Sequence, residues 1–163
     1  FRAPYTLAIG LVAPLTGRLT RLVDTGRHDS LRHLREAVVA ATLVVAAIGG
    51  LLAAWLGDPL LELVFGEGVR LGAALTAVIA VGSVFALANL VLSIGLLARG
   101  RPGDSARLWL AAAPLGLLTM VLLPVDDVTR TCWTFLVVEA AAWIGFLVVE
   151  WRSDRLAGGE EHR

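Results

Sequence analysis

The chain has 163 residues, of which 57% are hydrophobic and only 17% are charged, and its mean hydropathy is +0.77. This composition, together with long uncharged runs, excludes an ordinary water-soluble domain and predicts an integral membrane protein surrounded by lipids. The formal net charge is zero, and we expect no nucleic-acid partner.

Five apolar segments follow one another along the chain, at residues 3–17, 37–57, 71–98, 108–124 and 132–149. A helix needs about 20 apolar residues to cross the hydrocarbon core of a bilayer, and the uniform hydrophobicity excludes the alternating strands of a membrane barrel. The first segment is short and the sequence begins at Phe1, so we expect an N-terminally truncated piece of a longer protein. The third is long, which predicts a tilt or a bend near Gly82. The sequence therefore predicts an all-α integral membrane protein with five transmembrane helices.

Arginine is distributed unevenly between the connections. Eleven of the fourteen arginines lie in the first connection, the third connection and the C-terminal tail, at residues 18–36, 99–107 and 150–163. The positive-inside rule places these segments in the cytoplasm. We therefore predict a multi-pass protein of the inner (plasma) membrane, with a transmembrane bundle over residues 1–150 and a cytoplasmic polar tail over residues 151–163.

The second connection begins with Asp58 and Pro59. Proline is favoured in the first turn of a helix, so we expect the preceding span to end here and a short amphipathic helix to begin. Gly66 and Gly68 are expected to end that helix.

Small residues at four-residue spacing indicate where helices approach one another closely. Ala46, Gly50 and Ala54 lie on one face of the second predicted span, and Ala141 and Gly145 lie on one face of the fifth. Such faces favour close helix contacts in lipid, although chance spacing is about as common in a chain this rich in alanine.

The sequence offers little for an enzyme. It has no paired-histidine zinc motif, no phosphate-binding glycine loop and no nucleophile elbow, and we expect no catalytic residue, metal or cofactor. His28, His33 and the pair Asp126-Asp127 are expected to be solvated loop residues. A single cysteine, Cys132, excludes an internal disulfide and a cysteine-cluster metal site.

Glu139 is the one ionisable residue well inside a predicted span. A carboxylate there costs about 2.5 to 3.5 kcal/mol on insertion scales, so it should face a partner or water, or be protonated. At about 1.5 Å per residue, both Glu139 and Arg2 are expected within roughly 10 Å of the outer surface, where they would pair if their spans are neighbours. A structural role for each residue stays open beside an ion or anion contact. Asn89 and Ser93 either line a polar path or bond to neighbouring backbone.

The order of several short motifs resembles a known family of transporters. These are Pro-Leu-Thr at residues 14–16, Gly-Arg-His-Asp at residues 26–29, and Pro-Leu-Leu-x-Leu-x-Phe-Gly at residues 59–66. The chain is similar, best over residues 3–100, to the C-terminal half of a bacterial polysaccharide or lipid-linked oligosaccharide flippase of the multidrug/oligosaccharidyl-lipid/polysaccharide exporter superfamily. Val125 to Val128 stand where relatives often have a Gly-rich connection, so the resemblance is weaker in the last third.

The resemblance implies a part of a two-lobe transporter of 12 to 14 helices, completed by a missing N-terminal half of the same chain. The implied substrate is an undecaprenyl-diphosphate-linked oligosaccharide for polysaccharide or lipopolysaccharide biosynthesis, moved by alternating access without covalent chemistry. Its candidate binding residues are Arg2, Thr6, Asn89 and Glu139, with Arg2 as a contact for the diphosphate.

Three alternatives remain open. A drug/cation antiporter of the same superfamily would use Glu139 as its coupling carboxylate. A membrane-embedded enzyme acting on a polyprenyl lipid would use Asp126 and Asp127, or His28 and His33. A membrane scaffold without transport activity would leave the polar residues of the spans without a role.

Overall fold

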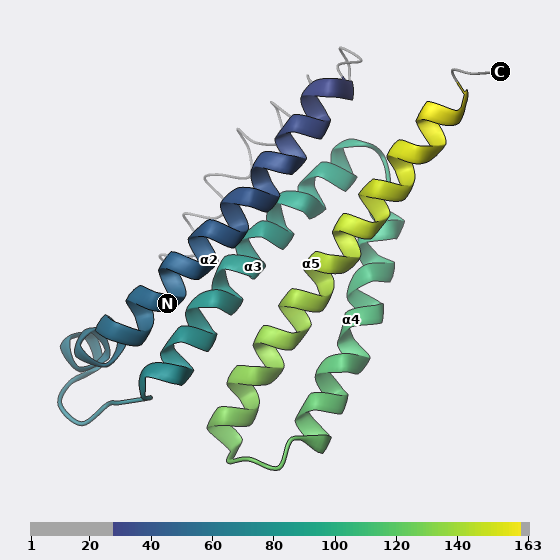
Figure 1. Ribbon diagram of the computed structural model, residues 1–163. Helices are drawn as coiled ribbons and strands as arrows, with labels where there is room; N and C mark the ends of the chain where they lie inside the picture. The colour runs from purple at the N-terminus through teal and green to yellow at the C-terminus, as the bar shows by residue number, and fades with distance from the viewer. Residues whose placement is uncertain (1–27, 161–163) are drawn as a thin grey trace.

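The described part of the chain consists entirely of long helices. The computed structural model describes the backbone of residues 28–160 and the side chains of residues 36–152. It contains α2 (His28–Phe65), α3 (Ala73–Ala98), α4 (Pro102–Leu122) and α5 (Asp127–Glu160) (Figure 1). Within this part, all four helices are long and apolar enough to cross a membrane. The prediction of an all-helical multi-pass membrane protein is confirmed to that extent, while the first predicted span, residues 3–17, lies outside the described residues.

The apolar character extends over the outer surface of the bundle. Large hydrophobic side chains with more than 70% of their surface exposed occur on α2 and α4, namely Leu51, Trp55, Leu63, Leu110 and Val121. Water-soluble monomers rarely expose contiguous apolar surface of this kind, whereas lipid chains solvate it well. The surface therefore fits a protein embedded in lipid.

The prediction that a helix ends at Asp58 and restarts at Pro59 is wrong, because α2 continues through both residues to Phe65. The side chain of Asp58 instead contacts the start of the next helix. Its Oδ1 accepts hydrogen bonds from the backbone N–H groups of Leu71 (3.1 Å) and Gly72 (3.0 Å), immediately before α3 begins. These donors have no partner within the helix, and a carboxylate is favoured at the positive end of the helix dipole. Asp58 thus stabilises the start of α3 rather than a restart of α2.

The helices form a row in the order α2, α3, α5, α4. Among the described helices, α3 packs on both α2 and α5, α5 packs on both α3 and α4, and contacts between α3 and α4 are few. Short connections reverse the chain between successive helices, so the neighbours α3 and α5 run parallel to each other (Figure 1). We call the end with connections 66–72 and 123–126 the outer end, and the end with connection 99–101 the inner end, following the orientation predicted from arginine.

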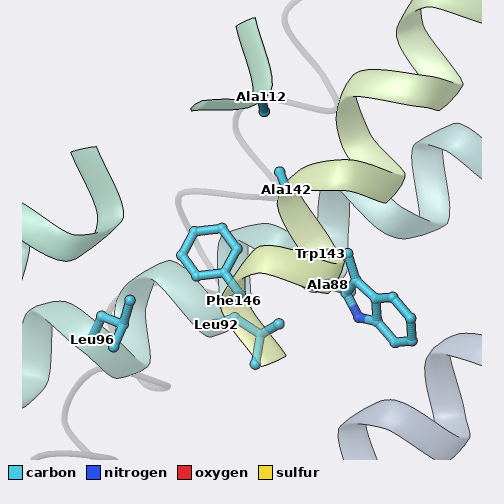
Figure 2. Close-up of a cluster of buried hydrophobic side chains, with 7 residues drawn as sticks. All are labelled: Ala88, Leu92, Leu96, Ala112, Ala142, Trp143 and Phe146. Atoms are coloured by element: carbon cyan, nitrogen blue, oxygen red, sulfur yellow. The ribbon is translucent and has the colours of Figure 1, made fainter. Parts of the chain in front are cut away.

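A buried apolar cluster lies where α3, α4 and α5 meet (Figure 2). In α3 the members of the cluster come from the half of the helix nearer the inner end, and in α5 they come from the middle of the helix. Phe146 and Leu96 are completely buried, and the rings of Trp143 and Phe146 lie against Phe85 of α3 and Trp109 of α4, respectively. The cluster consists of Ala88, Leu92, Leu96, Ala112, Ala142, Trp143 and Phe146.

Glycines set the closest approaches between helices. A Cβ placed on Gly57 of α2 would lie 2.6 to 2.8 Å from three side-chain atoms of Thr76 in α3. This proximity lets Thr76 Oγ1 donate a hydrogen bond to the carbonyl oxygen of Ala53 across the helix contact, at 2.9 Å. Two predicted small-residue positions also lie at contacts, because a Cβ on Gly50 would meet Val81 and a Cβ on Gly145 would meet Leu108.

Candidate functional site between helices α3 and α5

Two buried polar residues, Asn89 and Glu150, lie along the contact between α3 and α5, which we call the α3–α5 seam. On α3, Gly82, Phe85 and Asn89 follow one another at spacings of three and four residues, which keep them on one face of the helix, and Arg99 lies at its C-terminal cap. Each meets a residue of α5: Gly82 approaches Phe135, Phe85 lies 5.2 Å from Trp143 between ring centroids, and Asn89 and Arg99 bond to glutamates. The parallel run of the helices therefore brings segments about 50 residues apart into register.

Asn89 and Glu139 form the central polar contact of the seam. Asn89 Nδ2 donates hydrogen bonds to Glu139 Oε2 at 2.8 Å and to the backbone carbonyl oxygen of Glu139 at 2.9 Å. Asn89 is 1% exposed, whereas Glu139 is partly buried. Two of the predicted binding residues are thus in direct contact, a pairing that sequence reasoning did not propose because nothing in the sequence fixes which helices are neighbours.

Glu139 lies well inside α5. It follows the first residue of the helix, Asp127, by twelve positions. This places it about 18 Å from the start of the helix, near the middle of the apolar segment Asp127–Arg152. The predicted distance of about 10 Å was counted from Cys132, and α5 begins five residues earlier.

The surroundings of Glu139 are apolar. Within the described residues, α3 carries no charged side chain between Ala73 and Ala98, and α4 carries none between Leu108 and Leu122. The described helices that pack on α5 therefore supply an amide, not a cation, to this carboxylate. The predicted partner Arg2, and Thr6 with it, lie outside the described residues.

Two further polar atoms of the seam are buried without a hydrogen-bond partner among the described residues. They are the acceptor Asn89 Oδ1 and the donor Trp143 Nε1, and Trp143 is 9% exposed. Buried polar atoms in folded proteins are nearly always paired with protein or ordered water. The middle of the seam thus combines a carboxylate, an acceptor and a donor in an apolar environment, a set of groups able to bind a small polar group or a cation.

Asn89 and Ser93 have different neighbours. Asn89 points to α5, whereas the hydroxyl of Ser93 lies 3.5 Å from the hydroxyl of Ser105 on α4. Their four-residue spacing does place Asn89 and Ser93 on one face of α3. However, α5 packs on one part of this face and α4 on the part beside it.

A second polar contact of the seam lies near the inner end. Glu150 of α5 is 3% exposed, and its Oε1 lies 3.4 Å from Arg99 Nη2 at the C-terminal cap of α3. The sequence analysis placed Glu150 at the boundary between the predicted bundle and the polar tail and did not predict this contact. A signal was present, because Glu150 follows Glu139 by eleven residues, about three helical turns, and therefore lies on the same face of α5.

The residues considered for enzyme chemistry have structural roles where they are described. Asp126 Oδ2 accepts a hydrogen bond from the backbone N–H of Thr129 at 3.0 Å, so Asp126 caps the start of α5. This hydrogen bond lowers the pKa of Asp126 below its ordinary value. Asp127 forms an ion pair with Arg130 at 3.1 Å. The described residues contain no group of three or more His, Cys, Asp or Glu side chains placed to hold a metal ion.

The prediction that His28 and His33 are loop residues is wrong, because the backbone of both belongs to the first turns of α2. Their side chains lie outside the described ones.

Comparison of the chain with protein-family models, with curated proteins and with solved structures finds no match in any of the three.

Proposed function

We propose that this chain is part of a membrane transporter and that the α3–α5 seam belongs to its transport machinery. The observation that carries the proposal is the contact between Glu139 and Asn89 near the middle of two apolar, membrane-length helices. Ionisable residues within membrane spans are rare, and they typically face substrate or ion pathways.

Magnitudes argue against a purely structural role for this pair. A carboxylate at the centre of a spanning helix costs about 2.5 to 3.5 kcal/mol on insertion scales. A hydrogen bond between membrane helices stabilises the folded protein by about 0.6 kcal/mol on average. The two bonds donated by Asn89 therefore do not offset the cost, and an apolar pair of similar size would stabilise the seam more. Retaining the polar pair makes sense if it acts on a substrate or an ion.

The proposed substrate class is an undecaprenyl-diphosphate-linked oligosaccharide, flipped across the inner membrane for polysaccharide biosynthesis. This part of the proposal rests on the resemblance of the motifs at residues 14–16, 26–29 and 59–66 to lipid-linked oligosaccharide flippases. In it, Arg2 and Thr6 on the first predicted span contact the substrate together with Asn89 and Glu139.

Cation-coupled antiport of a drug is the second candidate function. It is favoured by one observation: the described helices packed on α5 place no cationic side chain at the depth of Glu139. A carboxylate without a fixed counter-ion is suited to bind an exchangeable cation. In this alternative Glu139 is the coupling site, and the glycan substrate is replaced by an organic cation.

The test uses the complete protein with Glu139→Gln, which keeps the shape and removes the charge. Glu67→Gln, an exposed residue of the outer connection, is the matched control. In cells that depend on this protein for glycan export, we expect Glu139→Gln to accumulate lipid-linked intermediates at least tenfold, while the control behaves as wild type. An unchanged lipid-linked pool in cells lacking the protein, with altered resistance to cationic drugs, would exclude the glycan and support antiport.

A further inference from the structure

The ion pair between Arg99 and Glu150 lies at the inner end of the α3–α5 seam. Glu150 is buried to the same degree as the apolar core, and its carboxylate lies beside Gly95, where an added Cβ would come within 3.8 Å of Oε1. Arg99 approaches from the C-terminal cap of α3 and keeps about a quarter of its side chain exposed. The pair therefore joins one helix to the other at the boundary between the apolar bundle and the arginine-rich connection.

Packing alone does not explain the position of Glu150, because a buried carboxylate there is electrostatically unfavourable. The C-terminus of α3 carries the negative end of its helix dipole, so a carboxylate beside it is repelled unless a cation intervenes. Burying an ion pair also costs desolvation energy that its attraction only partly returns, and apolar replacements are often more stable. An interaction of this kind holds two helices in a defined relation without contributing much to their stability.

The pair lies on the inner side of the buried cluster, beyond Leu96 on α3 and Phe146 on α5. The hydroxyls of Ser93 and Ser105 also meet near this end, where the three-residue connection 99–101 joins α3 to α4 (Figure 1). Ser93 lies at the α4 edge of the same face of α3 that carries Asn89 one turn further in. Opening the seam at the inner end would therefore uncover this edge of the face with Ser93 first and then Asn89.

We propose that Arg99 and Glu150 form an inner gate, an ion pair that keeps the cytoplasmic end of the α3–α5 seam closed and separates when the seam opens to that side. The inference rests on the proposed transport function, since only a protein with alternating access needs such a gate. It assigns a role to the one buried ion pair between described helices that the Asn89–Glu139 site does not use.

The experiment measures access to the seam from the cytoplasmic side. The complete protein carries Cys132→Ala and the reporter Ser93→Cys, and inside-out membrane vesicles are treated with a membrane-impermeant maleimide in the absence of substrate. Glu150→Gln removes the charge of the buried partner and leaves Arg99 free to extend into water, so folding should be preserved. We expect labelling of Ser93→Cys to become at least fivefold faster in Glu150→Gln.

Controls separate gating from general loosening. A reporter at Arg107, whose side chain is 82% exposed at the inner end, should label equally fast with and without Glu150→Gln. Exchange of the charges in the double variant Arg99→Glu with Glu150→Arg should restore slow labelling of the Ser93 reporter. If Glu150→Gln does not accumulate in membranes, Glu150→Asp is used instead, because the shorter side chain withdraws the carboxylate from Arg99.

Unchanged labelling of the Ser93 reporter in a folded Glu150 variant overturns the gate. Faster labelling that the charge exchange does not reverse also overturns it, since the effect would then come from packing. These outcomes are independent of the substrate assay: a gate that fails while glycan export depends on Glu139 leaves the proposed function standing. If the Ser93 reporter responds as expected but cells lacking the protein have an unchanged lipid-linked pool, the gate is supported and the glycan substrate is rejected.

Discussion

The contact between Gly57 and Thr76 gives the sharpest prediction about how this bundle is held together. In Gly57→Ala the new Cβ would lie 2.6 Å from Thr76 Cβ, 2.7 Å from Oγ1 and 2.8 Å from Cγ2. Thr76 cannot move aside, because its branch atoms are attached directly next to the backbone of α3. The helices must therefore separate, and the hydrogen bond from Thr76 Oγ1 to the carbonyl oxygen of Ala53 lengthens.

The size of the effect follows from three terms. Overpacking of a close contact costs about 1 to 3 kcal/mol. Loss of the interhelical hydrogen bond adds about 0.6 kcal/mol. The higher helix propensity of alanine offsets about 0.5 to 1 kcal/mol. We therefore expect Gly57→Ala to lower the free energy of unfolding by about 0.6 to 3 kcal/mol, although it is a conservative exchange in a helix.

The assay is reversible unfolding in mixed detergent–lipid micelles, followed by circular dichroism. Gly49→Ala is the matched control, because a Cβ at Gly49 in the same helix meets nothing within 4 Å, and this variant should be as stable as wild type or more. Thr76→Gly should rescue Gly57→Ala, whereas Thr76→Ala should not, since it keeps the Cβ that makes the closest contact. Equal stability of Gly57→Ala and Gly49→Ala would refute the close packing of α2 on α3.

Three other measurements test separate parts of the structure. Asn89→Leu is expected to leave the Glu139 carboxylate unpaired and to lower stability by about 1 to 3 kcal/mol, while Glu139→Leu combined with it should recover the whole loss or more, as a double-mutant unfolding cycle would show. Asp58→Ala should destabilise the start of α3 by about 0.5 to 2 kcal/mol, with Asp58→Asn close to wild type, and an equal effect of both would argue against the cap. The lowered pKa of Asp126 means that its contribution to stability is complete above the ordinary value of 3.8 and disappears as pH falls through the lower folded-state value. The free energy of unfolding measured across this acid range should therefore depend less on pH in Asp126→Ala than in wild type. A pH profile of the free energy identical to that of wild type would contradict the capping role.

Hydropathy was sufficient to predict the class of the protein and the existence of four of its helices. Each described helix contains most of one predicted apolar segment, because length and apolarity are what a membrane requires of a spanning helix. The ends of the helices were predicted less well. Helix α5 begins at Asp127 rather than Cys132, since the cap by Asp126 and the ion pair of Asp127 extend the helix beyond its apolar part.

Asp58 shows why local patterns mislead. Asp-Pro at a predicted span end is typical of a helix start, and both residues are compatible with that interpretation. In the structure the carboxylate binds the backbone of Leu71 and Gly72, which lie 13 and 14 residues further along the chain. The correct interpretation requires the path of the connection between α2 and α3, which periodicity and composition do not contain.

The candidate site was predicted as a set of residues but not as an arrangement. Asn89 and Glu139 were selected because each is polar within an apolar span, which is a property of the sequence alone. Their contact depends on the parallel packing of α3 and α5, which are not consecutive helices, and this neighbour relation is set by the shapes of all the packed faces together. The burial of Glu150 against α3 depends on the same relation.

The proposed transport function links the two polar contacts of the seam. Asn89–Glu139 lies near the middle of the apolar part of α5 and Arg99–Glu150 near the inner end, and the completely buried Leu96 and Phe146 belong to the apolar cluster beside the seam. Because Glu139 and Glu150 lie on the same face of α5, a small rotation of α5 about its axis would move both glutamates out of the seam on the same side. In antiparallel neighbours joined by a short connection, such a rotation is restrained at the joined end. Here α4 separates α3 from α5 in the sequence, so no short connection ties α3 to α5 at the end where Arg99 and Glu150 meet.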